Sequence, residues 1–136
     1  MFSNGLKSKP LPSQAVAELQ GIADWLQSEK AEFHLDKNIN ICNNKDGLAK
    51  ATSKFTTWFT TKVTPASSEN RVTAIHFCEP TIVPLDQDWA EYLIPVHAVG
   101  DTIMVDDQQL NPGYYCHLEE NVRVCGDFFA VLLLSR

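Results

Sequence analysis

Two stretches of this chain share the pattern that decides its C-terminal half: VHAVGDTIMV at residues 96–105 and VRVCGDFFAV at residues 122–131. Each places Gly-Asp between two arms rich in β-branched and aromatic residues, which is typical of a two-residue hairpin turn with glycine first. Because only Val, Gly, Asp and Val are identical, shared turn chemistry accounts for the similarity better than an internal repeat. The pattern predicts two β-hairpins, with a longer loop at 106–113 and a strand at 114–118 between them.

The segment VTAIHFC at residues 72–78 precedes these hairpins and is largely apolar at both alternating sets of positions. Apolar side chains on both faces are typical of a strand at the centre of a sheet. From Arg71 onward, short β-rich segments are divided by Pro, Gly and Asp. We therefore predict an antiparallel meander of about five strands in this half.

The N-terminal half predicts two helices with a small hairpin over 33–41 between them. Ser13, behind Pro12, can cap the first helix. Its apolar stripe consists of Val16, Leu19, Ile22, Ala23 and Leu26. The second helix begins near Asp46, and its shared face consists of Leu48, Ala51, Phe55, Phe59 and Lys62. The threonine-rich stretch 55–64 is also compatible with a strand.

These elements predict an α+β fold, in which two N-terminal helices pack on a mainly antiparallel sheet of about five to six strands formed mostly by residues 71–134. The 136 residues fit a single domain, with residues 1–12 as a loosely ordered N-terminal arm. The N-terminus lacks the apolar run of a secretory signal, and the longest apolar run, 128–134, is far shorter than the ~20 residues of a membrane-spanning helix. We expect a cytoplasmic protein with no membrane role.

Charge is divided unevenly along the chain. Residues 1–71 contain nine basic and seven acidic side chains, whereas residues 72–136 contain two basic and ten acidic ones, a net charge of −8. A surface of this kind attracts cations and basic proteins and repels phosphates. Nucleic acid is therefore not an expected partner, because its binding depends on Lys and Arg.

Alternation of the meander loops predicts where these acids gather. Loops 86–91, 106–113 and 126–127 would share one end of the sheet, and the opposite end would receive Asp101, Glu119 and Glu120. The candidate partner-binding residues at the first end, including two apolar anchors, are Asp86, Asp88, Trp89, Glu91, Tyr92, Asp106, Asp107 and Asp127.

A binding role for these acids competes with turn chemistry and with cation binding. Aspartate is frequent at turns because its side chain accepts hydrogen bonds from nearby backbone N–H groups. Asp106, Asp107 and Asp127 could instead supply oxygen ligands to a divalent cation, although no EF-hand loop sequence is present.

His76 and Cys78 lie two residues apart on a strand and therefore point to the same face. This suits a pair of metal ligands or a nucleophile with its base, whereas a buried thiol beside a hydrogen-bonded histidine is the purely structural alternative. Together with His97 and His117 they define an alternative pocket between helices and sheet. No C-x-x-C, G-x-S-x-G, P-loop or G-x-G-x-x-G motif is present, so we predict no metal site and no cofactor.

Cys116 and Cys125 would face each other if a two-residue turn at 120–121 joined their strands. A register that pairs Leu118 with Val122 instead places apolar side chains opposite each other. In that register the two cysteines lie on opposite faces, and we predict reduced thiols.

His97, His117 and Glu119, with Gly100-Asp101 and Pro112-Gly113 nearby, resemble the metal-binding strands of a cupin over less than a third of the chain. A cupin's first motif has two histidines one residue apart, followed by a glutamate. This sequence contains no H-x-H. We therefore do not carry the cupin's function over.

The sequence therefore predicts a small non-enzymatic binding or inhibitory protein, with the general character of bacterial immunity or anti-defence proteins. It would dock a basic protein partner through the acidic end of its sheet. The alternative is an enzyme or small-ligand-binding protein that uses the His/Cys pocket, with or without a metal.

Overall fold

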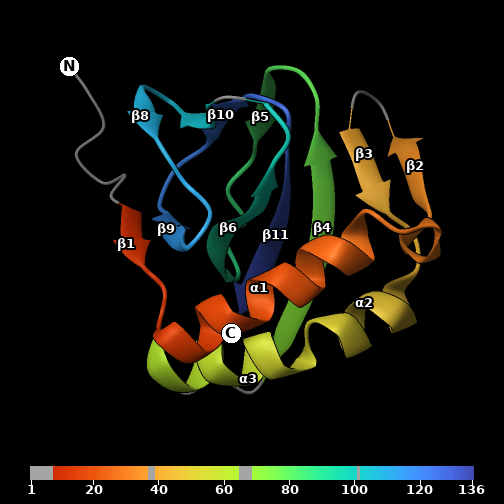
Figure 1. The fold of residues 1–136 in the computed structure, drawn as a ribbon. Helices are drawn as coiled ribbons and strands as arrows, with labels where there is room; N and C mark the ends of the chain where they lie inside the picture. The colour runs from red at the N-terminus through yellow and green to blue at the C-terminus, as the bar shows by residue number, and fades with distance from the viewer. Residues whose placement is uncertain (1–7, 37–38, 65–68, 101) are drawn as a thin grey trace.

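The computed structural model describes residues 8–36, 39–64, 69–100 and 102–136. Within these residues, three α-helices cover one face of a seven-stranded antiparallel sheet, and a four-stranded sheet covers the other face (Figure 1). The α+β class is confirmed. The expected two helices and five to six strands match only approximately, because one helix is divided and several strands are very short.

Helix α1 (Ser13–Leu26) matches the predicted amphipathic helix, and it buries Leu19, Ile22 and Leu26. Ser13 is its first residue and makes no capping hydrogen bond, and Val16 is 42% exposed. A short 3-10 helix, η1 (Glu29–Ala31), follows.

The second expected helix is two helices, α2 (Lys45–Ala51) and α3 (Ser53–Lys62), joined at Thr52. The threonine-rich stretch is helical as far as Lys62. Several of its hydroxyls donate a hydrogen bond to the carbonyl one turn earlier, including Thr57 to Ser53 at 3.0 Å. These bonds satisfy the hydroxyls within the helix, so the strand alternative for this segment is wrong.

The large sheet contains β1 (Ser8–Pro10), β2 (Phe33–Asp36), β3 (Ile39–Cys42), β4 (Asn70–Phe77), β6 (Ala90–Ala98), β9 (Tyr114–Leu118) and β11 (Phe128–Ser135), in the order β1-β9-β6-β11-β4-β3-β2. The small sheet contains β5 (Thr81–Val83), β7 (Met104–Val105), β8 (Gln108–Gln109) and β10 (Val122–Cys125), in the order β5-β10-β7-β8. The predicted hairpin over 33–41 is the β2–β3 pair. Ser8–Pro10, within the expected N-terminal arm, form the edge strand beside β9.

The predicted meander is wrong. From β4 to β11 the chain passes back and forth between the two sheets, except for the β7–β8 hairpin inside the small sheet. The connection from β6 to β7, which begins near Gly100, and the one from β10 to β11 at Gly126-Asp127 therefore link one sheet with the other, and neither closes a hairpin. Asp101 lies outside the described residues. This alternation of eight strands between two sheets is a jelly-roll arrangement, an architecture that cupins share.

Strand β11 lies at the centre of the large sheet and is buried on both faces. It pairs along its whole length with β4 on one side and with β6 on the other. Phe129, Val131 and Leu133 pack under the helices, whereas Phe128 and Ala130 pack against the small sheet. The predicted central position of residues 72–78 is confirmed, because β4 lies between β11 and β3.

A bulge interrupts the pairing of β6 with β11. Phe129 pairs with His97 and Ala130 with Pro95, so Val96 is the additional residue on β6. Pro95 lacks the N–H that regular pairing needs, and a bulge is where a sheet accepts proline. Because of this extra residue, His97 lies on the helix side of the sheet, opposite Phe129.

Cys116 and Cys125 lie on strands of different sheets, so both hairpin registers considered for them are wrong. All four cysteines are free thiols. No helix in the described part of the chain is long and apolar enough to span a membrane.

Two helical glycines have opposite surroundings and provide a matched pair of variants. A Cβ at Gly21 in α1 would meet nothing within 4 Å, whereas a Cβ at Gly47 in α2 would lie 2.6 Å from Trp25 and 2.6 Å from the capping Asn44. We expect Gly21→Ala to raise the free energy of unfolding by about 0.5–1 kcal/mol, because alanine loses less backbone entropy in a helix. Gly47→Ala should lower it despite the same propensity gain. Urea denaturation of both variants measures the difference, and equal shifts would contradict the packing around Gly47.

Candidate functional site

Three side chains that can bind a metal meet at one end of the large sheet: His76, Cys78 and Asp127. The Nε2 atom of His76 lies 2.7 Å from Oδ1 of Asp127 and 3.6 Å from Sγ of Cys78. All three ligand atoms lie within 4.8 Å of one another, and within the described residues no other His, Cys, Asp or Glu set forms such a group. The structure thus brings His76 and Cys78 together, and Asp127 joins them from a segment 51 residues beyond His76.

Strand β4 and the residue that follows it supply two of these side chains. Alternation along the strand places Val72, Ala74 and His76 on the helix side, and Cys78 follows directly after the last residue of β4. Asn40 on the neighbouring strand β3 pairs with His76 and directs its side-chain amide toward Sγ of Cys78 at 3.8 Å.

The corner between β10 and β11 supplies Asp127. Its backbone carbonyl accepts hydrogen bonds from the N–H groups of Val99 at 2.8 Å and Gly100 at 3.0 Å. Gly126 before it has a φ of 123°, and a Cβ there would lie 2.6 Å from the carbonyl oxygen of Thr102. Gly100 thus lies beside the Gly126-Asp127 corner, and the two hydrogen bonds connect the end of β6 to the start of β11.

The distance between Sγ and Nε2 suits two ligands of one metal ion, whereas the distance between Nε2 and Oδ1 is that of a hydrogen bond. With Zn–S near 2.3 Å and Zn–N near 2.0–2.1 Å, tetrahedral coordination separates sulfur and nitrogen by about 3.5 Å, and nitrogen and oxygen by about 3.3 Å. The observed 3.6 Å between Sγ and Nε2 agrees with this value. The Asp127 oxygen would have to withdraw from Nε2 by only about 0.6 Å.

A cysteine nucleophile activated by histidine fits the same geometry less well. In such an arrangement one ring nitrogen accepts the thiol proton, while the other donates to the orienting carboxylate. Here both Cys78 and Asp127 lie against Nε2. A single nitrogen cannot donate to the carboxylate and accept the thiol proton at once.

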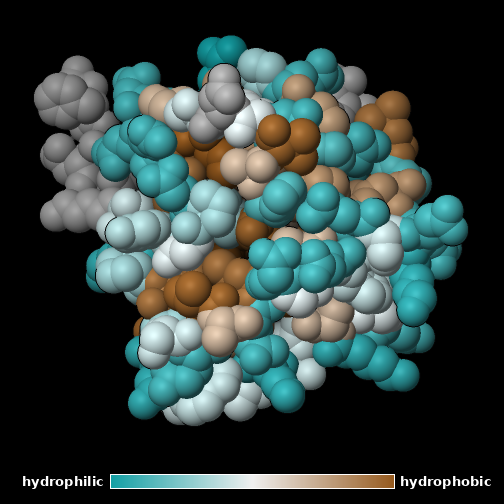
Figure 2. Space-filling model, viewed as in Figure 1, coloured by the Kyte–Doolittle hydropathy of each residue, from teal (hydrophilic) through white to brown (hydrophobic). Residues whose placement is uncertain are grey.

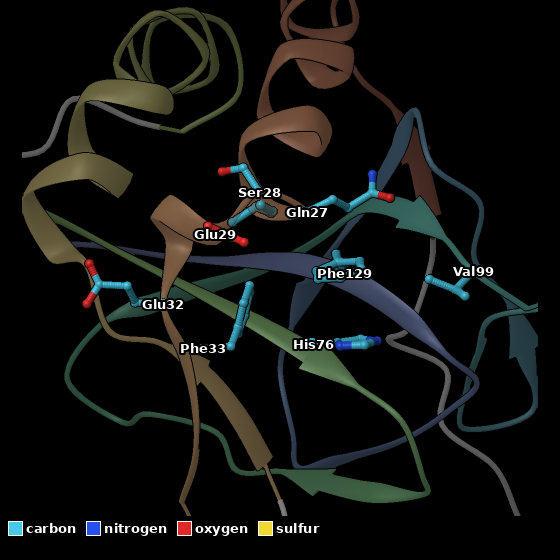
Figure 3. Close-up of a pocket in the computed structure, with 9 residues that line it drawn as sticks. Gln27, Ser28, Glu29, Glu32, Phe33, His76, Val99 and Phe129 are labelled. Atoms are coloured by element: carbon cyan, nitrogen blue, oxygen red, sulfur yellow. The ribbon is translucent and has the colours of Figure 1, made fainter.

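A hollow of about 510 Å³ adjoins the cluster on its helix side. Its floor contains His76, whose ring stacks on Phe129 with 4.1 Å between centroids, and Phe33 stands nearly perpendicular to both rings (Figure 3). Its rim comes from the end of α1 and from η1. The lining residues are Leu26, Gln27, Ser28, Glu29, Glu32, Phe33, His76, Val99 and Phe129.

The other two histidines of the predicted pocket lie outside the cluster. His97 lies beyond Phe129, with 6.3 Å between ring centroids, and does not line the hollow. His117 is on β9, stacked on Tyr92 at 4.8 Å, and Tyr92 is near the opposite end of β6. The structure therefore brings two of the four predicted pocket residues together.

The acidic residues do not share one end as expected. Asp86 and Asp88 precede β6, and Asp127 bonds to residues that follow β6, a separation of roughly 26 Å along this nine-residue strand. The error comes from the two-residue strand β8, which lies inside the expected loop 106–113 and reverses the direction of every later strand. The 119–121 loop consequently lies with the first group, since the Asn121 side chain accepts a hydrogen bond from Leu85.

Hydrogen bonds to backbone N–H groups explain why aspartate occupies two of these positions. Oδ1 of Asp86 accepts a hydrogen bond from the N–H of Asp88, and Oδ1 of Asp106 accepts one from the N–H of Arg123, both at 2.9 Å. Asp106 has a φ of 51° in the β7–β8 turn, a conformation that aspartate tolerates better than most residues. Asp88 and Asp107 are exposed.

Three other predicted partner-binding residues, Glu91, Tyr92 and Trp89, make contacts within the protein. Glu91 and Tyr92 are 4% and 5% exposed, so neither can act as a surface anchor without rearrangement. Trp89 lies between two guanidinium groups, those of Arg71 at 4.8 Å and Arg136 at 4.4 Å from the ring. On the face seen in Figure 2, hydrophilic side chains predominate and hydrophobic ones show as separate patches. Docking of a basic partner at this end stays a prediction.

Comparisons with known proteins show a similarity of fold and no similarity of sequence family. No family model and no curated protein sequence matches the chain. The structure resembles that of a prolyl-4-hydroxylase from Pseudomonas putida, with a TM-score of 0.53, 9% sequence identity, and coverage of 97% of this chain and 92% of that chain. At this identity the similarity shows the fold alone.

Sequence reasoning missed the aromatic floor of the hollow and the role of Asn40. Phe33 and Phe129 resemble any other core residues in the sequence, because their position depends on pairing between distant strands. The Gly126-Asp127 dipeptide was a usable signal, since it marked a tight corner with a carboxylate, but the sequence did not indicate which residues it would meet.

The buried carboxyl of Glu91 should make stability depend on pH. Burial raises the pKa of Glu91 above its ordinary value of 4.5, although the N–H of Asp86 donates a hydrogen bond to it. The folded chain then binds this proton more tightly than the unfolded chain, so its contribution to the free energy of unfolding falls as pH rises from below 4.5 through the raised pKa. We expect wild-type stability, measured relative to Glu91→Gln, to be higher in acid than at neutral pH. Urea denaturation at several pH values measures the difference in free energy of unfolding between the two proteins. A difference that does not change with pH would contradict the raised pKa of Glu91.

Gly126 is expected to be essential for the position of Asp127. Gly126→Ala places a Cβ at a φ of 123° and against the carbonyl of Thr102, so the corner has to shift. The strain alone costs about 1–3 kcal/mol. Gly113→Ala is the matched control, because Gly113 has a φ of 96° but open space around it. Chemical denaturation should show the larger loss for Gly126→Ala, and equal losses would mean that the contact with Thr102 is unimportant.

Proposed function

We propose that this protein binds a divalent transition-metal ion through His76, Cys78 and Asp127 and uses it to bind or transform a small molecule in the adjoining hollow. The observation that supports this is the convergence of three different ligand atoms within 4.8 Å from two distant segments. The proposal takes up the pocket hypothesis from the sequence and replaces two of its histidines by Asp127.

The donor set favours zinc or a similar borderline ion. Imidazole, thiolate and carboxylate are all zinc ligands, and thiolate is a poor ligand for calcium or magnesium. Three protein ligands leave the fourth tetrahedral position for water or a small molecule, which is typical of catalytic rather than structural zinc sites. When bound, such an ion polarises a carbonyl group or lowers the pKa of a coordinated water.

The surroundings of the cluster are compatible with access by solvent and ligand. The side chains of His76 and Asp127 are 24% and 45% exposed, and Cys78 is exposed. His76 belongs to both the cluster and the hollow, so a molecule in the hollow lies next to the cluster. The ligands are attached to strand ends and a hydrogen-bonded corner, which holds them more firmly than long loops would.

The fold supports an enzymatic or ligand-binding role without specifying it. A prolyl-4-hydroxylase is an enzyme, and the similar fold shows that this architecture can carry a catalytic site. We do not transfer that activity, because 9% identity does not carry residue roles.

Titration with Co²⁺ tests the metal site and its thiolate ligand. Because a bound thiolate produces a charge-transfer absorption band, we expect the full-length protein to give this band with one equivalent of Co²⁺, and Zn²⁺ to abolish it. Cys78→Ser should lose the band. Cys125→Ser is the matched control, since Cys125 is a partly exposed thiol two residues before Asp127, and it should keep the band. Absence of the band in the wild type, or its loss in the control alone, would refute the proposed site.

A further inference from the structure

We propose that the hollow binds a small organic ammonium ion, with its apolar part against Phe33 and Phe129 and its charge beside Glu29. The inference rests on the proposed function in one respect: it takes this hollow to be the ligand side of the metal site. It adds the chemical class of the ligand, which the three metal-binding side chains do not specify.

The aromatic rings form a corner that suits a cation with an apolar body. Phe33 and Phe129 have their centroids 5.6 Å apart at an interplanar angle of 65°, and Phe33 meets His76 at 72°. The face of an aromatic ring carries partial negative charge and attracts ammonium groups within about 6 Å. Because one face of Phe129 is stacked on His76, the ring of Phe33 and the remaining surface of Phe129 are what the two rings offer to a ligand in the hollow.

The polar groups of the rim leave one carboxylate for a ligand. Gln27 donates its amide to the carbonyl of Ala23, and Ser28 donates its hydroxyl to the carbonyl of Trp25. The Glu29 carboxylate makes no hydrogen bond or ion pair within the described part of the chain, and in Figure 3 it lies on the Phe33 side of the hollow. The Glu32 carboxylate points away from the hollow.

The charge of the lining residues favours a cationic ligand over an anionic one. All nine lining residues are described by the structure, and none is lysine or arginine. A carboxylate or phosphate in the hollow would therefore meet Glu29 with no lysine or arginine in the lining to offset the repulsion. The volume of about 510 Å³ lies within the usual range for small-molecule sites.

Calorimetric titration of the full-length protein with three aromatic probes of similar size but different charge tests this inference. Benzylammonium carries the predicted charge, benzyl alcohol is neutral and phenylacetate is anionic. We expect benzylammonium to bind most tightly and phenylacetate most weakly. Equal affinity for the three probes, tighter binding of phenylacetate, or no binding of benzylammonium would overturn the inference.

Two variants assign the recognition to the residues named. Glu29→Gln should weaken benzylammonium binding about two- to fivefold, the effect of an exposed ion pair, and leave benzyl alcohol unaffected. Glu32→Gln is the matched control and should change the affinity for neither benzylammonium nor benzyl alcohol. Phe33→Leu keeps an apolar side chain but removes the ring face, and it should weaken benzylammonium about two- to tenfold. If Glu29→Gln and Glu32→Gln weakened binding equally, the ligand would be attracted only by the overall negative charge of this surface. That result would overturn the assignment to Glu29.

The same protein distinguishes failure of this inference from failure of the metal site. Benzylammonium binding with no Co²⁺ band would refute the metal site and leave the ammonium site standing. A Co²⁺ band without benzylammonium binding would refute the ammonium site alone. Titrating Cys78→Ser with benzylammonium adds a check, because this variant should lose the band and keep the hollow.

Discussion

Burial of β11 on both faces is the constraint on which the three layers depend. This strand pairs along its length with β4 and β6, and its alternating side chains enter two separate cores. Burying one large apolar side chain contributes about 1.5–3 kcal/mol, so a strand that does this at most of its positions leaves little freedom in its register. Because all three strands keep a common register, His76, the start of β11 and the end of β6 lie together at one end of the sheet.

The candidate site is a consequence of that alignment. Strand ends are where a sheet can present polar side chains to solvent while its backbone stays hydrogen-bonded. The carbonyl of Asp127 holds two N–H groups that follow β6, and Gly126 allows the close approach. His76 then has two roles in one ring, since it packs on Phe129 in the core and presents Nε2 to Cys78 and Asp127.

The local sequence pattern correctly predicted the elements whose contacts are near in sequence. Helix α1, the β2–β3 hairpin, the central strand β4 and the shared face of His76 and Cys78 all follow from spacing along the chain. The Gly-Asp corners were recognised as tight turns, but the chemistry of a turn is the same whether the next strand pairs with the previous one or crosses to another sheet. Gln108 and Gln109 are polar and exposed, so nothing in their sequence marked β8, and its omission placed Asp127 at the wrong end.

The sequence by itself determined the α+β class, the apolar faces of its long elements and the concentration of acids after residue 71, because periodicity and charge are properties of the chain. Only the tertiary structure decided that Asp127 meets His76 and Cys78, that Phe33 and Phe129 form a hollow beside them, and that Glu91 and Tyr92 are buried. Those facts depend on which strands pair, and burial of β11 between two cores, rather than any local turn, determines that pairing.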